Sequence, residues 1–536
     1  MRRWNAWGNE NSEYTTELSD SLREVLEALV GKSTGLPMAG LEEVLAKVPI
    51  SRLSEHALID TDPEVRVRHA RGQSFPDSLV MQSGDFGVFP DGVAFPETTE
   101  QVVEVLRYCA QHSVTAIPYG GGTSVAGHIN PTNGPRPVLT ISMARMNTLL
   151  NFDQESQIAT FGAGTAGPMI EAQLQALGYT LGHYPQSWEL STVGGWVASR
   201  SSGQQSLRYG RIEQLFAGGT VATQQGVMEI PTIPASSAGP DLREMVMGSE
   251  GRFGVISEVA VRVNRLPEHE SFHAIFFPSW KEGMATAKTL VQDKTPLSMI
   301  RLSNQMETLS LLHMGTDAEQ VALLEAELSE HGINDSKVML TVGVTGKQLQ
   351  CNASLAQLRE CCDSNSGVFA GAEFGQRWER GRFGAPYLRE ALAAGGYAVD
   401  TMETAVEWSK VEAAMNDIEL AIREALSEEG EQVHVYTHLS HVYGQGSSIY
   451  STYVFRFDES FEKTHQRWEK LKRAGAQQIV ASGGTISHHH GVGVDHKPYL
   501  QAEKGEVGLA AIDALCNFFD PEGLMNPGKL VDSHAE

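Results

Sequence analysis

IPYGGGTSV, residues 117–125, follows a predicted helix and a short apolar strand. Three successive glycines allow positive φ angles, and their backbone N–H groups can converge on an anion with no Cβ in the way. Phosphate is the natural ligand of such a loop, although a flexible turn would use the same residue types. The segment is not a Walker A loop, because no lysine follows in place, and it is not the GxGxxG dinucleotide fingerprint.

Two later segments place glycines and small hydroxyl residues in the same way. They are SWELSTVGGWVASRSSG, residues 187–203, and MGSEGRFGVI, residues 247–256. A mononucleotide would need only one such loop. Three loops together favour a long, polar, phosphorylated ligand that lies across all of them.

Hydrophobic periodicity divides the chain into three regions. Residues 1–86 show helical spacing, and residues 87–267 alternate short β-branched runs with helical patterns. Residues 268–536 mix strands, such as residues 448–457, with long helices. We predict an α+β protein with a helical N-terminal region, a ligand-binding domain and a C-terminal domain.

Composition excludes several classes of protein. The chain has 536 residues, which is too long for one hydrophobic core, and its net charge of -25 would repel nucleic acids and anionic bilayers. Its five cysteines lack CxxC spacing, and no segment approaches the roughly 18 uncharged apolar residues of a membrane span. We therefore expect a cytoplasmic protein with no nucleic-acid partner and no disulfide framework.

Several segments resemble a known family. PYGGGTS, STVGGW and GSEGRFGVI are similar to the FAD loops of the vanillyl-alcohol-oxidase type of flavoprotein, and DPEGLMNPGKL is similar to its closing motif. GHYPQSWELSTVGGW, SMIRLSN, APYLREAL and above all GGTISHHHGVG resemble the alkylglycerone-phosphate synthase (alkyl-dihydroxyacetonephosphate synthase) family within it. The similarity runs over residues 4–530.

The resemblance implies a PCMH-type FAD-binding domain of two α+β subdomains. It also implies a cap domain with an antiparallel sheet and helices, whose last part, about residues 480–536, returns to the FAD site. Gln186 departs from the family, whose better-known members have an acidic residue there, and we expect binding to survive because glutamine both donates and accepts hydrogen bonds. The FAD-binding residues implied are Pro118, Tyr119, Gly120, Gly121, Gly122, Thr123, Ser124, Gln186, Ser187, Trp188, Glu189, Leu190, Ser191, Thr192, Ser199, Arg200, Ser201, Ser202, Glu250, Gly251, Arg252, Phe253, Gly254, Val255 and Ile256.

The histidine run in GGTISHHHGVG suits proton transfer near neutral pH. On an extended segment, His488 and His490 would point one way and His489 the other. A metal site is the rival interpretation, but no carboxylate or cysteine stands at a recognisable ligand spacing. We favour flavin-site histidines and predict no metal.

Three further residues take their roles from the resemblance. Tyr450 matches the family's catalytic acid/base, Arg389 matches a substrate-binding arginine, and Arg301 matches another arginine near the active site. Residues 448–455 alternate, so that Tyr450 and Thr452 share one face of the strand. A guanidinium is a suitable partner for a substrate phosphate.

The implied reaction exchanges the acyl group of acyl-dihydroxyacetone phosphate for a fatty alcohol in ether lipid biosynthesis. Tyr450 would move a proton, His488, His489 and His490 would position and polarise the substrate, and FAD would serve as electrophile and electron sink. The alternative is an FAD-dependent dehydrogenase or oxidase of a 2-hydroxy acid such as D-lactate or 2-hydroxyglutarate, because the glycine loops are common to both. A flavin-binding module without catalysis has no support in the sequence.

The partner expected from the resemblance is a lipid-like, phosphorylated small molecule. Such a substrate is compatible with peripheral membrane contact, which the net charge would restrict to a local apolar patch. A homodimer is also compatible with the sequence.

We predict that the FAD is bound without a covalent bond. Many relatives attach the flavin through a histidine directly after the first glycines, but Thr123 stands there and His128 lies too far along the loop. Acid or heat should therefore release the flavin into the supernatant as FAD. Flavin that stays with the denatured polypeptide would contradict this assignment.

Overall fold

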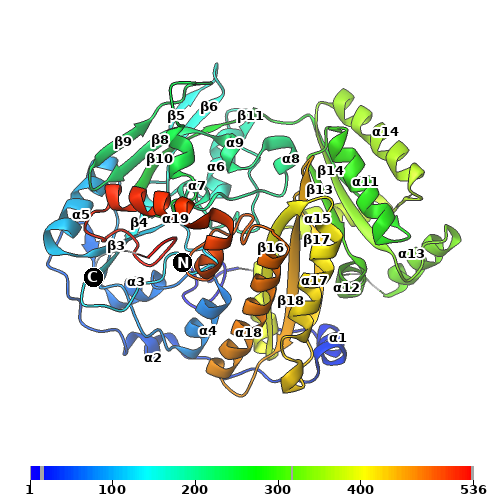
Figure 1. The fold of residues 1–536 in the computed structure, drawn as a ribbon, viewed down its shortest axis with the longest axis horizontal. Coiled ribbons are helices and arrows are strands. Elements are labelled where there is room, and N and C mark those ends of the chain that lie inside the picture. The colour runs from blue at the N-terminus through cyan, green and yellow to red at the C-terminus, as the bar shows by residue number, and fades with distance from the viewer. Residues whose placement is uncertain (1, 13–16, 316–317, 533–536) are drawn as a thin grey trace.

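The computed structural model describes residues 2–12, 17–315 and 318–532. An FAD-binding half, with sheets of four and five strands and a two-stranded sheet of β7 and β11, lies beside a cap half built on a larger antiparallel sheet (Figure 1). None of the helices in the described ranges is long and apolar enough to cross a membrane. All five cysteines lie in those ranges and are free thiols.

The N-terminal region is mainly helical and also supplies one strand to the first sheet. Ser74 and Asp77 form a capping box at the start of its last helix, which satisfies N–H groups of the first turn. The elements are α1 (Asp20–Val30), α2 (Leu41–Leu45), β1 (Ile59–Asp60), α3 (Pro63–Arg68) and α4 (Phe75–Ser83).

The first subdomain is a four-stranded sheet of order β1-β2-β4-β3, in which β2, β4 and β3 are parallel. Its elements are β2 (Gly92–Ala94), α5 (Thr99–His112), β3 (Thr115–Tyr119) and β4 (Val138–Ser142). Ile117, Leu139 and Ile141 are fully buried, because both faces of these short strands are covered. The glycine loop therefore leaves the sheet at the carboxyl end of a buried parallel strand.

The second subdomain is a five-stranded antiparallel sheet of order β5-β6-β10-β8-β9. The loop at residues 247–254 leads directly into its central strand β10. The elements are β5 (Leu149–Asp153), β6 (Ile158–Gly162), α6 (Gly167–Gln175), β7 (Tyr179–Thr180), α7 (Val193–Ser199), α8 (Ser206–Tyr209), α9 (Ile212–Leu215), β8 (Phe216–Thr223), β9 (Gly226–Ile230), α10 (Leu242–Val246), β10 (Val255–Arg262) and β11 (Asn264–Arg265).

The cap is a seven-stranded antiparallel sheet of order β15-β12-β14-β13-β17-β18-β16, as the family resemblance predicts. Its strands are β12 (His269–Phe277), β13 (Met299–Ser303), β14 (Val338–Gly346), β15 (Val368–Phe369), β16 (Tyr397–Glu407), β17 (His434–Leu439) and β18 (Gly446–Arg456). Its helices are α11 (Trp280–Gln292), α12 (Gln305–Gly315), α13 (Ala318–Glu330), α14 (Gln348–Ser364), α15 (Ala372–Gly381), α16 (Ala385–Ala394), α17 (Val411–Glu424) and α18 (Phe461–Ala481).

Side chains alternate across this sheet. Ile449 and Tyr453 on β18 enter the core formed with α11, α14, α17 and α18, whereas Tyr450 and Thr452 point to the opposite face, as residues 448–455 predict. The sheet therefore presents one polar row of side chains toward the FAD-binding half.

The chain ends by returning to the first subdomain. Helix α19 (Leu500–Phe519) lies across the FAD-binding half in Figure 1, and the segment after it runs beside β3. Ala116 N donates to Leu524 O at 2.8 Å, and Asn526 N donates to Ala116 O at 2.9 Å. The last residues thereby add to the sheet that carries the glycine loop.

Candidate active site

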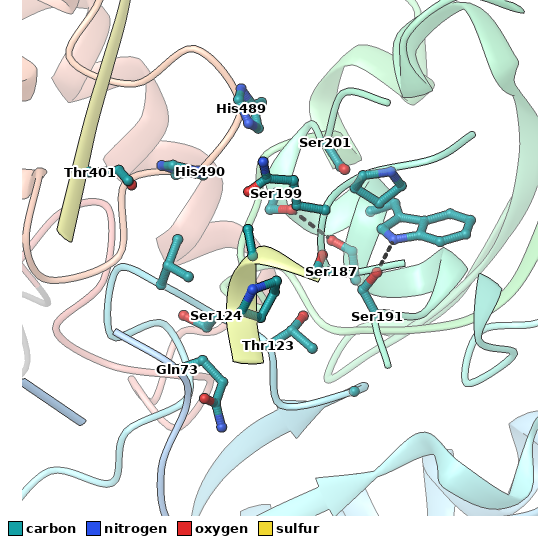
Figure 2. A pocket seen from close by; sticks show the side chains of 18 of the residues that line it. Gln73, Thr123, Ser124, Ser187, Ser191, Ser199, Ser201, Thr401, His489 and His490 are labelled. Carbon is teal, nitrogen blue, oxygen red and sulfur yellow. Dashed lines mark hydrogen bonds between the residues drawn. The ribbon is translucent and has the colours of Figure 1, made fainter. Parts of the chain in front are cut away.

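A cavity of about 660 Å³ lies between the FAD-binding loops and the polar face of the cap sheet. Its volume falls in the range of ligand sites. Figure 2 shows His489 and His490 on one side of this cavity and the serine and threonine side chains of the predicted FAD loops, among them Thr123, Ser124 and Ser187, on the other. The cavity is therefore lined by residues from both halves of the molecule.

The glycines of the first loop have a packing role in addition to the one that we predicted. A Cβ at Gly121 would lie 1.8 Å from Leu190 O, and one at Gly120 would lie 2.3 Å from Thr192 Oγ1. Gly122 has a φ of +64°, which favours glycine. The missing side chains of Gly120 and Gly121 thus let two loops pack together, and the anion-binding role of the loop stays a prediction.

The residues of these loops nevertheless fit FAD. Among the contacts of the described residues, the backbone N–H groups of residues 121–124 have no protein acceptor, so they can donate to a pyrophosphate. A Cβ at Gly195 would meet only Thr192 Oγ1, at 3.4 Å, and would otherwise enter the cavity. The Oδ1 atom of Asn526 is buried at the cavity wall without a partner.

Most of the FAD-binding residues predicted from the resemblance line this cavity. Those that do are Pro118, Tyr119, Gly120, Gly121, Gly122, Thr123, Ser124, Gln186, Ser187, Ser191, Thr192, Ser199, Ser201, Glu250, Gly251, Gly254, Val255 and Ile256.

The other predicted residues face the protein or the surface. Glu189 accepts a hydrogen bond from Tyr387 at 2.6 Å, Arg200 pairs with Glu244 at 3.0 Å, and Phe253 stacks on Phe519. Trp188, Leu190, Ser202 and Arg252 also lie outside the cavity lining. A contiguous motif cannot be assigned to a ligand as a block, because successive side chains point in different directions.

Sequence reasoning gave His128 no role beside the cofactor, yet it lies in the cavity wall. Its Nδ1 atom is 2.6 Å from Ser124 Oγ, and its Nε2 atom is 3.1 Å from Glu250 Oε1. Burial alone would lower the pKa of His128, but the charge of Glu250 and its hydrogen bond raise that pKa above its ordinary value.

Tyr450 is buried in the cavity wall and surrounded by imidazoles. Its ring stacks on His438 with centroids 4.9 Å apart, and the rings of His489 and His490 lie 6.1 and 5.7 Å away. Its hydroxyl donates to Thr401 Oγ1 at 3.2 Å. Burial raises the pKa of Tyr450 well above its ordinary value, so the phenol is protonated at neutral pH.

The predicted alternation of the three histidines is wrong. His489 and His490 both line the cavity, whereas His488 points away from it and lies 2.6 Å from Arg211 Nη1 through its Nε2 atom. The segment is a loop rather than an extended strand, because its backbone curves around one carboxylate, that of Glu403.

Glu403 is the main residue that sequence reasoning missed. Its Oε1 atom accepts hydrogen bonds from His489 N at 2.7 Å and His490 N at 2.6 Å, and its other oxygen contacts the His489 ring. Burial alone would raise the pKa of Glu403, but interaction with His489 and His490 lowers it well below the ordinary carboxyl value. The signal in the sequence was a carboxylate inside YAVDTMETAV, an otherwise mainly apolar and hydroxyl-bearing strand.

The two predicted arginines both line the cavity but have different partners. Arg301 Nη2 pairs with Glu307 Oε1 at 2.7 Å, and Glu307 also contacts His438 Nδ1 at 2.9 Å. Arg389 Nη1 donates to the carbonyl of Gln73 at 2.6 Å, and no described carboxylate lies within 4 Å of it. Arg389 therefore keeps more of its charge available to a ligand.

Two groups of side chains could offer metal-ligand atoms, one of His441, His488 and His489 and the other of Glu403, His489 and His490. The fold thus supplies the carboxylate that the sequence spacing lacked. The Arg211 guanidinium lies against His488, and Glu403 already accepts two backbone N–H groups. These contacts suit a hydrogen-bonded network, and the proton-transfer and positioning roles of the histidines stay predictions.

Comparisons with known proteins agree with this architecture. A family model described as FAD linked oxidases, C-terminal domain, matches residues 266–530, and an FAD binding domain model matches residues 90–230. An alkyldihydroxyacetonephosphate synthase of Trypanosoma brucei brucei is 28% identical, over 99% of this chain and 92% of the relative. A mitochondrial D-lactate dehydrogenase (cytochrome) of Arabidopsis thaliana is 25% identical, over 89% of this chain and 78% of the relative. A solved alkyldihydroxyacetonephosphate synthase has the same fold, with a TM-score of 0.83, 23% identity and 98% of each chain covered.

Glu403→Gln should loosen the histidine loop. The amide still accepts the two backbone hydrogen bonds but loses the charged contact with the His489 ring, so we expect a loss of about 1–3 kcal/mol in the free energy of unfolding at neutral pH. Chemical denaturation of the FAD-loaded protein would measure it. Glu407→Gln, on the same strand but exposed and paired with Lys410, is the matched control and should change little.

The stability difference between wild type and Glu403→Gln should depend on pH. Because the folded-state pKa of Glu403 lies below its ordinary value of 4.5, its stabilisation is complete above that value and is lost as the pH falls below it. A difference between wild type and variant that stays constant down to strongly acidic pH would contradict the assignment.

Proposed function

This chain belongs to the family of FAD-linked oxidases and is an FAD-dependent enzyme, and from that premise we propose that it makes an ether bond by exchanging the acyl group of acyl-dihydroxyacetone phosphate for a fatty alcohol. The match to an alkyldihydroxyacetonephosphate synthase over nearly the whole chain supports this choice. The observation that carries it is one cavity that combines the FAD loops, Tyr450 with its histidines, and Arg389.

The exchange is balanced without net oxidation. The bond from the substrate carbon to the acyl oxygen breaks and releases a carboxylate, a new bond forms to the alcohol oxygen, and the alcohol proton is released. FAD, when bound, supplies an electrophile and electron sink for this chemistry.

Tyr450 is the group proposed to move a proton at the reacting carbon. Its phenol is neutral at pH 7, and its oxygen is held by Thr401 at the cavity wall. The flanking rings of His489 and His490 are proposed to position and polarise the substrate there.

Arg389 is the preferred partner for the substrate phosphate. Its planar fork matches a phosphate group, and its charge is not neutralised by a neighbouring carboxylate among the described residues. Arg301 is largely committed to Glu307 and His438, so we assign it to holding the wall of the cavity beside Tyr450. His488 would act through its neighbours, because it lies outside the cavity.

Three statements about the surroundings of the enzyme remain predictions. A lipid-like substrate would favour peripheral contact with a membrane through a local apolar patch. A cytoplasmic location and a homodimer are the accompanying expectations.

Oxidation of a 2-hydroxy acid is the second candidate, supported by the similarity to a D-lactate dehydrogenase. The purified enzyme should convert acyl-dihydroxyacetone phosphate and hexadecanol to the alkyl product, detected by mass spectrometry, and should keep its flavin oxidised when mixed anaerobically with D-lactate or 2-hydroxyglutarate. Bleaching by a hydroxy acid without ether formation would instead establish a dehydrogenase.

Tyr450→Phe should abolish most of the turnover while keeping the fold. It removes one oxygen and one hydrogen bond, so we expect a stability change of about 1 kcal/mol, normal FAD content, and a fall in turnover of roughly 100- to 10,000-fold. Ether formation and thermal unfolding measure the two effects.

Tyr453→Phe is the control on the opposite face of the same strand. Tyr453 donates to Asp400 in the core at 3.1 Å, so its variant should lose stability with nearly normal turnover. If Tyr450→Phe behaved like Tyr453→Phe, proton transfer would have to be reassigned to His489 or His490.

A further inference from the structure

A lysine interrupts the buried face of helix α18. Trp468, Leu471, Ala476 and Ile479 recur at helical spacing and enter the hydrophobic core, and Lys472 lies on the same face with only 8% of its surface exposed. Helix faces of this kind exclude lysine unless its ammonium group has a partner. The function described so far gives Lys472 no role.

The protein itself provides little for this ammonium group. Nζ donates to the carbonyl of Thr401 at 3.5 Å, a long contact, and no carboxylate of the described residues lies within 4 Å of it. The Oδ2 atom of the nearby Asp400 accepts hydrogen bonds from Tyr453 at 3.1 Å and Trp468 at 2.7 Å. A buried ammonium in such surroundings needs an anion from elsewhere.

Lys472 is also placed beside the reacting groups. It lines the same cavity as Tyr450 and Arg389. Thr401 contacts Lys472 through its carbonyl and Tyr450 through its hydroxyl, so one residue joins the ammonium to the phenol. The charge therefore lies on the cap side of the cavity, beside Thr401 and Tyr450.

We propose that Lys472 binds the phosphate of the substrate together with Arg389. The substrate class rests on the proposed function, whereas the presence of an oxyanion site rests on the geometry alone. A flexible ammonium on the wall beside Tyr450 and a planar guanidinium from α16 would hold a dianion between them. The phosphate would then set the distance between the reacting carbon and the Tyr450 hydroxyl.

The competing explanation is that Lys472 only compensates buried carboxylates. Asp495 is the candidate, because it is largely buried and its Oδ2 atom has no hydrogen-bond partner. Removing a lysine with that structural role would lower stability and leave ligand affinity unchanged. Removing an anion-binding lysine would weaken ligand binding and would not lower stability, because the protein alone does not satisfy the charge of that lysine.

The test measures binding, so it does not depend on turnover. Dihydroxyacetone phosphate and inorganic phosphate would be titrated into the FAD-loaded protein by calorimetry, for wild type, Lys472→Met, Lys472→Arg and Lys472→Gln. Arg473→Met is the matched control, because Arg473 is the next residue on α18 and is exposed.

We expect Lys472→Met and Lys472→Gln to weaken phosphate binding by roughly 10- to 100-fold, the value of one charge-assisted hydrogen bond. FAD content should be unchanged, the melting temperature should be equal or higher, Lys472→Arg should recover part of the affinity, and Arg473→Met should resemble wild type. Weaker phosphate binding in a protein that makes no ether product would uphold this inference while refuting the proposed reaction.

Three results would overturn the assignment. Unchanged affinity for both phosphates would remove the anion site, and loss of FAD from Lys472→Met would move the lysine to the cofactor. A fall in melting temperature that Asp495→Asn reverses in the double variant would establish the compensating role. Butyrate serves as a further probe: if only its binding weakened, the site would hold a carboxylate rather than a phosphate.

Discussion

The loop at residues 489–493 donates backbone hydrogen bonds to two buried carboxylates, one from each half of the molecule, and the geometry of the cavity depends on this constraint. Glu403 of the cap accepts from His489 N and His490 N, and Glu250 of the FAD-binding half accepts from Val492 N and Gly493 N. Buried carboxylates are costly unless they are fully hydrogen-bonded, and these N–H groups would otherwise be buried without partners. The hydrogen bonds satisfy the carboxylates and the N–H groups together, and they hold the loop between the two halves of the molecule.

This constraint places chemically different groups around one space. Two of the imidazoles are neutral near pH 7, since burial lowers the pKa of His490 to about 4 and lowers that of His438 as well. Positive charge comes instead from the Arg389 guanidinium and the Lys472 ammonium, which both line the cavity. The cavity is thus suited to an anionic substrate although the chain as a whole carries a net charge of -25. Whole-chain charge describes the solvated surface, and ligand preference is decided by a few buried groups.

Sequence reasoning reached the main elements because their signals are local. The glycine loop at residues 120–122, the strand carrying Tyr450 and the antiparallel character of the cap follow from backbone freedom, from a period of two, and from the family resemblance. The predictions failed or were incomplete where a local pattern depends on residues that are distant in the sequence and adjacent in the fold. The histidine run looked extended but curves around Glu403, and nothing in the sequence indicated that Gly120 and Gly121 pack against residues 190–192.

By itself, the sequence determined the class of protein, the glycine-rich loops and the strand that bears Tyr450, since each shows in short motifs of residues adjacent in the chain. Only the tertiary structure decided which side chains meet in the cavity. Lys472 and His128 line it from a helix and a loop far apart in sequence, and Glu403 of a third element, strand β16, holds the histidine loop beside it. Their roles arise from burial. A buried imidazole, carboxylate or ammonium has no water to hydrogen-bond, so its few protein partners decide its charge and what it can bind.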